Sequence, residues 1–252
     1  MQTAIAYRVT ALFQIAITFI WVFILYALWD AAFLESGAIA GYTWGEMRTY
    51  ILIAYGLNAL VGWRVGGQMM GTIRTGEITR ELTRPLNYRS TQVATAAGLS
   101  VIEGVIGLLL VVILGTLFFD VQPPDSVRAA ILFVFAVLVG FLIKALCIFL
   151  VSLLCFWTLS SVGLMWAQQS VISILSGTLI PIAMMPDWLR LVAEVLPLRG
   201  IVSTPLQIYL GKSLGWDLVG LLALQVGWLA VLWVFSDWAW KAAFNAVEIQ
   251  GG

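Results

Sequence analysis

The densest cluster of charge in this sequence lies in the segment from Gly71 to Arg89. Glutamate and arginine recur there at intervals of three residues, as in Glu77 and Arg80, a spacing that brings opposite charges together on a helix. Such side chains recognise a charged surface through ion pairs. Because only 10% of the residues in the chain are charged, this cluster indicates a docking element for a partner in water. The alternative is an ordinary positively charged loop that only fixes the topology.

The same segment has the pattern of a short amphipathic helix. Ile78 and Leu82 are four residues apart and therefore share one face, and charged residues occupy the other faces. Arg84 precedes Pro85, and proline disfavours a helical conformation in the residue before it, so we expect the helix to end there. The charged positions are Arg74, Glu77, Arg80, Glu81 and Arg84.

A second set of polar residues lies within apolar stretches, where an ionisable side chain costs about 2.5–3.5 kcal/mol or more and tends to be paired. Glu103 and Lys144 lie at matching depths, so we predict an ion pair that is either structural or part of a substrate path. Arg64 is near the end of its stretch, where its guanidinium can reach the membrane interface. Gln168 and Gln169 are expected to bond across helices or to line the translocation path.

Several kinds of chemistry are not expected of this chain. It contains no histidine and only two cysteines, so we predict no metal site and no catalytic triad. The residues from Gly211 to Ser213 resemble the end of a phosphate-binding loop, but Leu206 stands where that motif requires glycine. We therefore expect no catalytic residue, no cofactor and no ATP bound by this chain itself, and no nucleic-acid partner.

The elements that must position these residues are membrane-spanning helices. The composition is 62% hydrophobic, and apolar runs of about 20 residues, the length needed to cross a membrane, recur along the chain. Runs this long and continuous favour helices over the alternating strands of a barrel. The fold class we predict is all-α, a single polytopic membrane domain over residues 1–252 with six transmembrane helices. The expected spans are about 11–29, 50–70, 91–119, 129–159, 162–181 and 218–240.

The orientation follows from the distribution of positive charge. An even number of spans places both termini on one side of the membrane. The second connection carries four arginines, and positively charged loops favour the cytoplasm. We therefore predict that this connection and both termini are cytoplasmic.

The connection between the fifth and sixth expected spans is apolar but interrupted by proline. Pro181, Pro186 and Pro197 break it, and Trp188 contributes to its apolar surface. A stretch of this kind is tolerated at membrane depth only where it is buried in protein or lines a cavity. We expect short re-entrant helices on the outer side; the alternative is a flexible outer loop with a few interfacial tryptophans.

Two motifs in this order resemble those of the permeases of ABC-2 type transporters, over nearly the whole chain. The first is Gly-Glu-Ile-Thr-Arg-Glu-Leu-Thr-Arg-Pro-Leu-Asn-Tyr in the charged loop. The second is Pro-Ile-Ala-Met-Met-Pro-Asp-Trp-Leu after the fifth span. The resemblance is to the bacterial six-span subgroup and implies an inner-membrane location. One departure is the short segment before the first span.

The resemblance also implies partners. Permeases of this kind dimerise with an identical or related permease within the lipid bilayer, and each couples to a separate cytoplasmic ATPase subunit that binds ATP and Mg. By resemblance, the coupling helix is Ile73 to Leu86, with Arg74, Glu77, Ile78, Arg80, Glu81, Leu82, Arg84 and Pro85 as its residues.

The function that we expect is therefore that of the permease subunit of an ABC transporter, and an exporter of a small molecule, lipid or drug. Two other classes remain open. One is an ATP-independent secondary carrier or channel, which would need more convergent polar groups within the membrane than this chain supplies. The other is a membrane-embedded enzyme, against which the absence of histidine counts.

Overall fold

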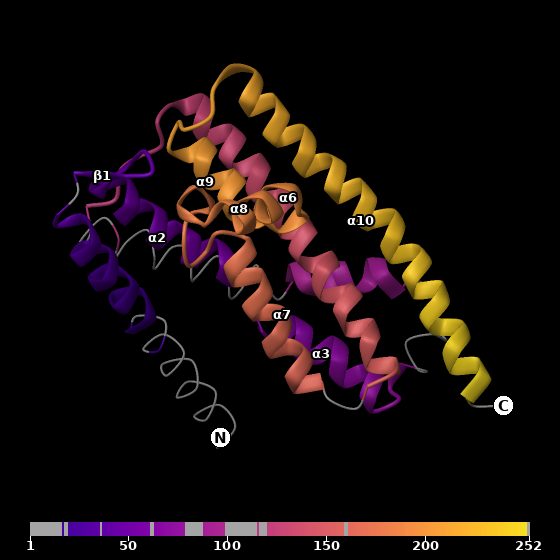
Figure 1. Ribbon diagram of the computed structural model, residues 1–252. Coiled ribbons are helices and arrows are strands. Elements are labelled where there is room, and N and C mark those ends of the chain that lie inside the picture. Colours follow the sequence, from indigo (N-terminus) through magenta and orange to yellow (C-terminus); the bar gives the residue numbers. More distant parts are fainter. Residues whose placement is uncertain are drawn as a thin grey trace.

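The computed structural model describes residues 17, 20–35, 37–60, 63–78, 88–98, 115, 120–158 and 161–250. This part of the chain is almost wholly helical, with a single two-stranded hairpin (Figure 1). The helical fold class is thus confirmed for the described residues. The number of spans stays a prediction, since most of the expected third span lies outside them.

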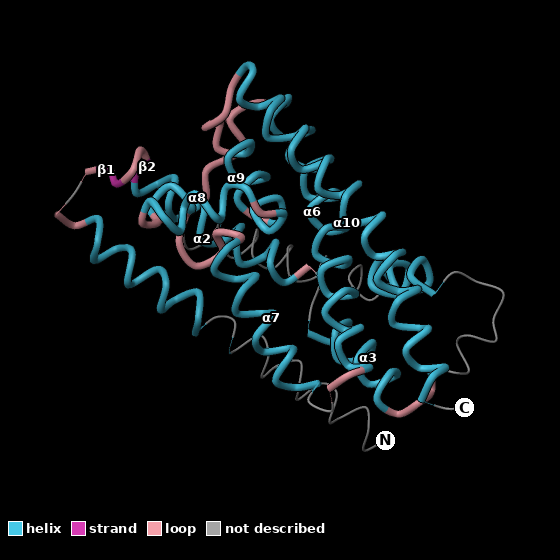
Figure 2. Tube along the Cα trace, turned by 45° about the vertical axis from the view of Figure 1, so that its right-hand side comes forward, coloured by secondary structure: helices cyan, strands magenta, loops and turns pink. Residues whose placement is uncertain are grey.

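Two long apolar helices lie side by side and form the frame of the molecule (Figures 1 and 2). The first is α6 (Val127–Leu153), continued by the 3-10 helix η1 (Leu154–Phe156), and the second is α10 (Gly215–Gln250). Their apolar portions are 30 and 29 residues long, which exceeds the length needed to cross a membrane. The expected span 129–159 matches α6 closely, whereas α10 extends beyond the expected 218–240 at both ends.

The expected span 50–70 corresponds to two helices. The first, α2 (Trp44–Ala59), begins six residues earlier than predicted because Thr43 caps it. Its side chain accepts a hydrogen bond from the backbone of Glu46, whose side chain bonds back to Thr43. The second, α3 (Trp63–Arg74), begins after a bend at Leu60. Residues 61 and 62, between the two helices, lie outside the described residues.

The expected span 162–181 is also shorter than predicted. Helix α7 (Ser161–Leu175) ends before a turn in which Gly177 has a φ of +87°. The hydroxyl of buried Tyr50, on α2, donates a hydrogen bond of 2.7 Å to the carbonyl of Gly177. A Cβ at Gly177 would lie only 2.8 Å from that hydroxyl, so the turn requires glycine.

Four short helices connect α7 to α10. They are η2 (Ile182–Met184), α8 (Asp187–Val195), η3 (Pro197–Ile201) and α9 (Ser203–Tyr209). The interval is thus helical and broken, as its prolines predicted. How deeply it enters the membrane stays a prediction.

The remaining elements complete the two ends of the frame. A helix over Ile20–Phe33 carries the described part of the expected first span, and residues 88–98 form another helix. The strands β1 (Ala38–Ile39) and β2 (Tyr42–Thr43) pair antiparallel. Figure 2 places this hairpin and α9 toward one end of α6, and α3 toward the other.

Each end of the frame has its own buried core. At the hairpin end, Met47, Tyr50 and Leu206 are each at most 1% exposed and pack with residues of α6. At the opposite end, Met70 and Phe149 are fully buried in a second cluster that joins α3, α6, α7 and α10. The connections at either end are therefore attached to packed helices.

Candidate functional site

The charged segment, Gly71 to Arg89, begins within the last turn of α3. Thr75 to Glu77 form a turn in which Gly76 has a φ of +75°, and the chain is helical again at Ile78. Ile73 and Arg74 therefore belong to α3, and the helix that the resemblance implies from Ile73 starts no earlier than Ile78 in the described residues. A left-handed glycine is the usual reason for such a stop. The predicted positions Arg80, Glu81, Leu82, Arg84 and Pro85 lie outside the described residues.

The start of this segment is anchored in the protein. Ile78 is 4% exposed and belongs to the second core cluster together with Met69, Met70 and Ile73 of α3. Glu77, beside it, is exposed. The side chain of Ile78 thus holds the segment against the helices, and that of Glu77 faces outward.

The end of the segment is anchored on α10. Arg89 is 5% exposed, and its Nη1 donates to the carbonyl of Trp233 at 2.7 Å and to the hydroxyl of Ser236 at 3.2 Å. It also forms an ion pair with Asp237 at 3.1 Å. The ring of Tyr88 stacks on Trp240 with a centroid separation of 4.4 Å. Sequence reasoning counted Arg89 only as a loop cation, because nothing in the sequence links it to α10.

The second predicted site centres on Lys144, which is 1% exposed on α6. Its ammonium group donates hydrogen bonds to the backbone carbonyl of Asn58 and, at 2.9 Å, to the Oδ1 atom of the same residue. Glu103 lies outside the described residues, so the predicted pair with Lys144 stays a prediction. Asn58 was missed, although a polar residue within an apolar run was the available signal.

Asn58 extends this contact to α7. Its Nδ2 donates to Ser173 Oγ at 3.2 Å, and Gln169 Nε2 donates to the same hydroxyl at 3.3 Å. Gln169 thus bonds within its own helix, and Ser173 makes the contact to α2. The result is a polar network that joins α2, α6 and α7, the kind of contact that holds helices together in lipid.

Gln168 and Arg64 are the two other residues predicted within the apolar stretches. The Nε2 atom of Gln168 is buried and has no hydrogen-bond partner among the described residues. Arg64 is the second residue of α3, and its side chain lies outside the description.

The prolines of the outer interval mark the starts of its helices. Pro181 and Pro186 precede η2 and α8, and Pro197 is the first residue of η3. Trp188 is 71% exposed on α8, whereas Ala193 on the opposite face is fully buried. The interval therefore presents an apolar outer face.

Close backbone contact holds η3 against the two long helices. A Cβ at Gly140 of α6 would lie 2.5 Å from the carbonyl oxygen of Gly200. Gln225 of α10 donates hydrogen bonds to the carbonyls of Gly200 at 2.8 Å and Ala136 at 2.7 Å. Neither Gly140 nor Gln225 was predicted, because both roles depend on contacts between distant segments.

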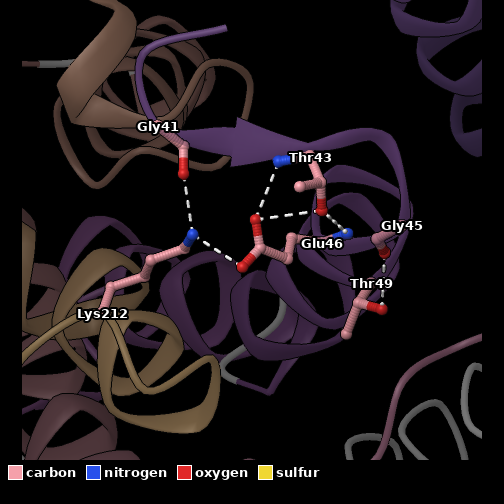
Figure 3. Close-up of polar contacts among 6 residues, drawn as sticks. All are labelled: Gly41, Thr43, Gly45, Glu46, Thr49 and Lys212. Carbon is pink, nitrogen blue, oxygen red and sulfur yellow. Dashed lines mark hydrogen bonds and ion pairs between the residues drawn. The ribbon is translucent and has the colours of Figure 1, made fainter. Parts of the chain in front are cut away.

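A polar contact joins the hairpin to the connection before α10 (Figure 3). Lys212 Nζ lies 2.6 Å from a carboxylate oxygen of Glu46 and donates to the carbonyl of Gly41 at 2.7 Å. The other oxygen of Glu46 accepts from the backbone N–H of Thr43 at 2.7 Å. Two segments far apart in the sequence are thereby fixed to each other.

The charges in this contact shift the pKa values of the hairpin end. Partial burial acts to raise the pKa of the Glu46 carboxyl, but the hydrogen bonds and charge of Lys212, with those from Thr43, outweigh it and lower the pKa below 4.5. Burial, together with the negative charge of Glu46, raises the pKa of Tyr42 to about 12. At neutral pH, Glu46 is therefore ionised and Tyr42 is neutral.

Within the described ranges, no three residues among histidine, cysteine, aspartate and glutamate are grouped so that they could hold a metal ion. The described contacts connect separate segments of the chain. A charged segment is attached at both ends to a packed helical frame, and a polar network joins the helices of that frame.

A family model described as ABC-2 family transporter protein matches residues 19–251, which is nearly the whole chain. A comparison with curated proteins gave no match.

Proposed function

Since the chain belongs to the ABC-2 family of transporter proteins, and is thus a membrane component of a transporter, we propose that it is a permease that a separate ATPase drives to export its substrate. The observation that carries the proposal is the charged segment between Glu77 and Arg89, which is anchored at both ends on packed helices. Attachment of both ends to packed helices suits a docking site that must pass on movement.

The ATPase is proposed to bind the charged residues between these anchors. Ile78, before these residues in the sequence, and Tyr88, after them, are both buried. The predicted contacts Arg80, Glu81 and Arg84 fall in this interval. ATP and Mg belong to the partner subunit, and this chain supplies the surface on which that subunit acts.

The transport cycle follows from this arrangement. ATP binding brings the ATPase subunits together, the charged segment follows, and the attached helices move so that the path opens outward. The movement requires that the ATPase bind the two permease conformations with different affinity, since a partner that binds both equally shifts nothing.

The proposal includes six spans and an outer re-entrant segment. Supporting it, the described connections fall at the two ends of the frame: the hairpin and the α7–α10 interval at one, the turn after α3 and η1 at the other (Figure 1). The buried helix α9 and the close contact of Gly140 with η3 fit a segment that closes the outer end of the path.

A second permease is the further proposed partner. The helix over Ile20–Phe33 and α7 both keep exposed apolar residues, such as Phe23 at 63% and Trp166 at 61%. These faces are available to a neighbouring permease or to lipid. Whether that permease is identical or related is left to the experiment below.

The experiment compares two double variants, each of which replaces one arginine and one glutamate with alanine. Arg80→Ala with Glu81→Ala changes the proposed docking segment. Arg190→Ala with Glu194→Ala removes an ion pair of 2.9 Å on α8, at the other end of the molecule. Each tagged protein is purified in mild detergent, and the ATPase subunit that accompanies it is quantified.

We expect the first variant to lose most of its ATPase partner and its ATP-dependent transport while inserting normally, and the α8 variant to keep both. Equal recovery of ATPase with both variants, or normal transport by the assembled first variant, contradicts the proposed docking segment.

The second candidate is an ATP-independent carrier, which the intramembrane network of Lys144, Asn58 and Ser173 favours as a potential ion site. Against it, the ammonium group of Lys144 already has two oxygen partners on Asn58. Transport by proteoliposomes that contain this chain but no ATPase would decide for the carrier.

A further inference from the structure

We propose that Arg89 is a positioning residue that clamps the end of the charged segment to α10, so that the ATPase moves the last helix directly. This inference rests on the proposed function. It adds a second route of coupling to the one through α3, which is continuous in sequence with the start of the segment.

The contacts of Arg89 all fall on one short stretch of α10. Its Nη1 atom donates to the carbonyl of Trp233 and the hydroxyl of Ser236, and it pairs with the carboxylate of Asp237. The guanidinium carbon also lies 4.1 Å from the centre of the Trp233 ring. Stacking and directed hydrogen bonds together fix the orientation of a guanidinium in a way that a flexible lysine cannot reproduce.

The contact is buried on the side of Arg89. The arginine side chain is 6% exposed, whereas that of Asp237 is 43% exposed. Loss of its partners would leave a guanidinium buried without hydrogen bonds, which costs free energy. Arg89 and α10 are therefore expected to move together. The carboxylate can be rehydrated more easily and contributes less to the clamp.

Aromatic packing continues the attachment along α10 and across to α6. Tyr88 stacks on Trp240, and the ring of Phe149 on α6 lies 6.2 Å from both. Tyr88 and Arg89 are the last residues of the charged segment. A displacement of this end of the segment is therefore passed to α10 through direct contacts.

The start of the segment has a different attachment. Ile78 belongs to the buried cluster that includes Met69 and Met70 of α3 and also Tyr88. Ile78 follows α3 in the sequence after a single turn, whereas Arg89 makes its polar contacts on α10. A tilt of the segment would move these helices relative to each other, which a single anchor could not do.

The test measures hydrogen exchange in the complete transporter, purified with its ATPase in nanodiscs, with and without trapping by ATP and vanadate. The readout is the nucleotide-dependent change in deuterium uptake in peptides from α3 and from the Trp233–Ala243 part of α10. In the wild type, we expect a change in both. The variants are Arg89→Gln, Arg89→Lys and Asp237→Asn.

With Arg89→Gln, we expect the change in α10 to be lost and the change in α3 to remain. Arg89→Lys should lose part of the change in α10. Asp237→Asn should lose least of it, since that carboxylate is half exposed. Arg190→Gln, which removes an arginine from the ion pair on α8, is the matched control and should leave both changes intact.

A merely structural role gives a different pattern. Arg89→Gln would then raise uptake in α10 equally with and without nucleotide, and the difference between the two states would persist. That result overturns the proposal, as does a wild type in which α3 responds and α10 does not. If no ATPase accompanies the wild type, the proposed function itself fails. Should Arg89→Gln not assemble, Asp237→Asn and Arg89→Lys provide the same comparison.

Discussion

Replacing Lys212 with methionine removes the cation that joins the hairpin to the connection before α10. The substitution keeps the length and much of the apolar stem of the side chain. It removes the ion pair of 2.6 Å with Glu46 and the hydrogen bond of 2.7 Å to the carbonyl of Gly41. The Glu46 carboxylate keeps its hydrogen bonds from Thr43, and its backbone N–H still donates to the Thr43 hydroxyl, so the helix cap of α2 survives.

The magnitude follows from the exposure of the pair. The side chains of Lys212 and Glu46 are 26% and 20% exposed, so the pair is neither at the surface nor fully withdrawn from water. Exposed pairs contribute about 0.2–1 kcal/mol, and hydrogen bonds to charged groups about 1.5–3 kcal/mol. We expect Lys212→Met to lower the free energy of unfolding by about 1–2 kcal/mol at pH 7, or roughly 2–8 °C in Tm for a chain of this size.

The pH dependence provides a sharper test. The pKa of Glu46 is lower in the folded protein than its ordinary value of 4.5. The stabilisation from its ionised form is thus present above that value and is lost as the pH falls through the folded pKa. The Tm difference between wild type and Lys212→Met should therefore be full at pH 7 and shrink below pH 4.5.

The assay is thermal unfolding in detergent, followed by intrinsic fluorescence, at a series of pH values. Arg128→Met is the control, because Arg128 is an exposed cation at the start of α6 that forms no ion pair with any described residue. A Tm difference for Lys212→Met that stays constant across the pH series, or that Arg128→Met reproduces, refutes the reasoning.

Three other substitutions test the helical frame by thermal unfolding. Gly140→Ala places a Cβ 2.5 Å from a carbonyl oxygen of η3 and should lower the free energy of unfolding by about 1–3 kcal/mol. Gly220→Ala in α10 is the control, because its Cβ meets nothing within 4 Å. Equal Tm values for the two variants contradict the close contact. Gln225→Leu removes two buried hydrogen bonds and should cost about 1–3 kcal/mol; an unchanged Tm refutes their contribution. Asn58→Leu removes the Oδ1 partner of the buried ammonium of Lys144 and leaves it the backbone carbonyl of residue 58. It should cost about 1.5–3 kcal/mol, more than Lys144→Met, which removes the buried charge itself; the reverse order shows that Lys144 has another partner.

The long helices were predictable because the membrane constrains them strongly. The apolar run that became α6 is bounded by the polar residues around Ser126 and by Trp157, and hydrophobicity alone places it within a few residues. The ends of α2 and α7 were not predictable in this way. Both helices end within apolar runs, α2 at a bend at Leu60 and α7 before a turn at Gly177. At Gly177 the reason is a contact with Tyr50 on another helix.

The polar residues were also predictable only in part. Lys144 was predicted to be paired because a buried ammonium must be, but its partner Asn58 depends on how α2 packs against α6. Likewise, Arg89 was recognised as a cation, and only the fold brings it to Asp237 on α10. Residue type thus indicates the need for a partner, and packing decides which residue meets it.

The central claim is that a separate ATPase drives this permease, and the most direct measurement is purification of the tagged chain from its native membrane in mild detergent. Mass spectrometry identifies the proteins that accompany it, and an ATPase assay is made on the eluate. We expect an ATPase subunit and a second permease, identical or related, with ATP hydrolysis in the same fraction. A homo-oligomer of this chain that transports substrate without any ATPase would contradict the claim and would identify the protein as a secondary carrier.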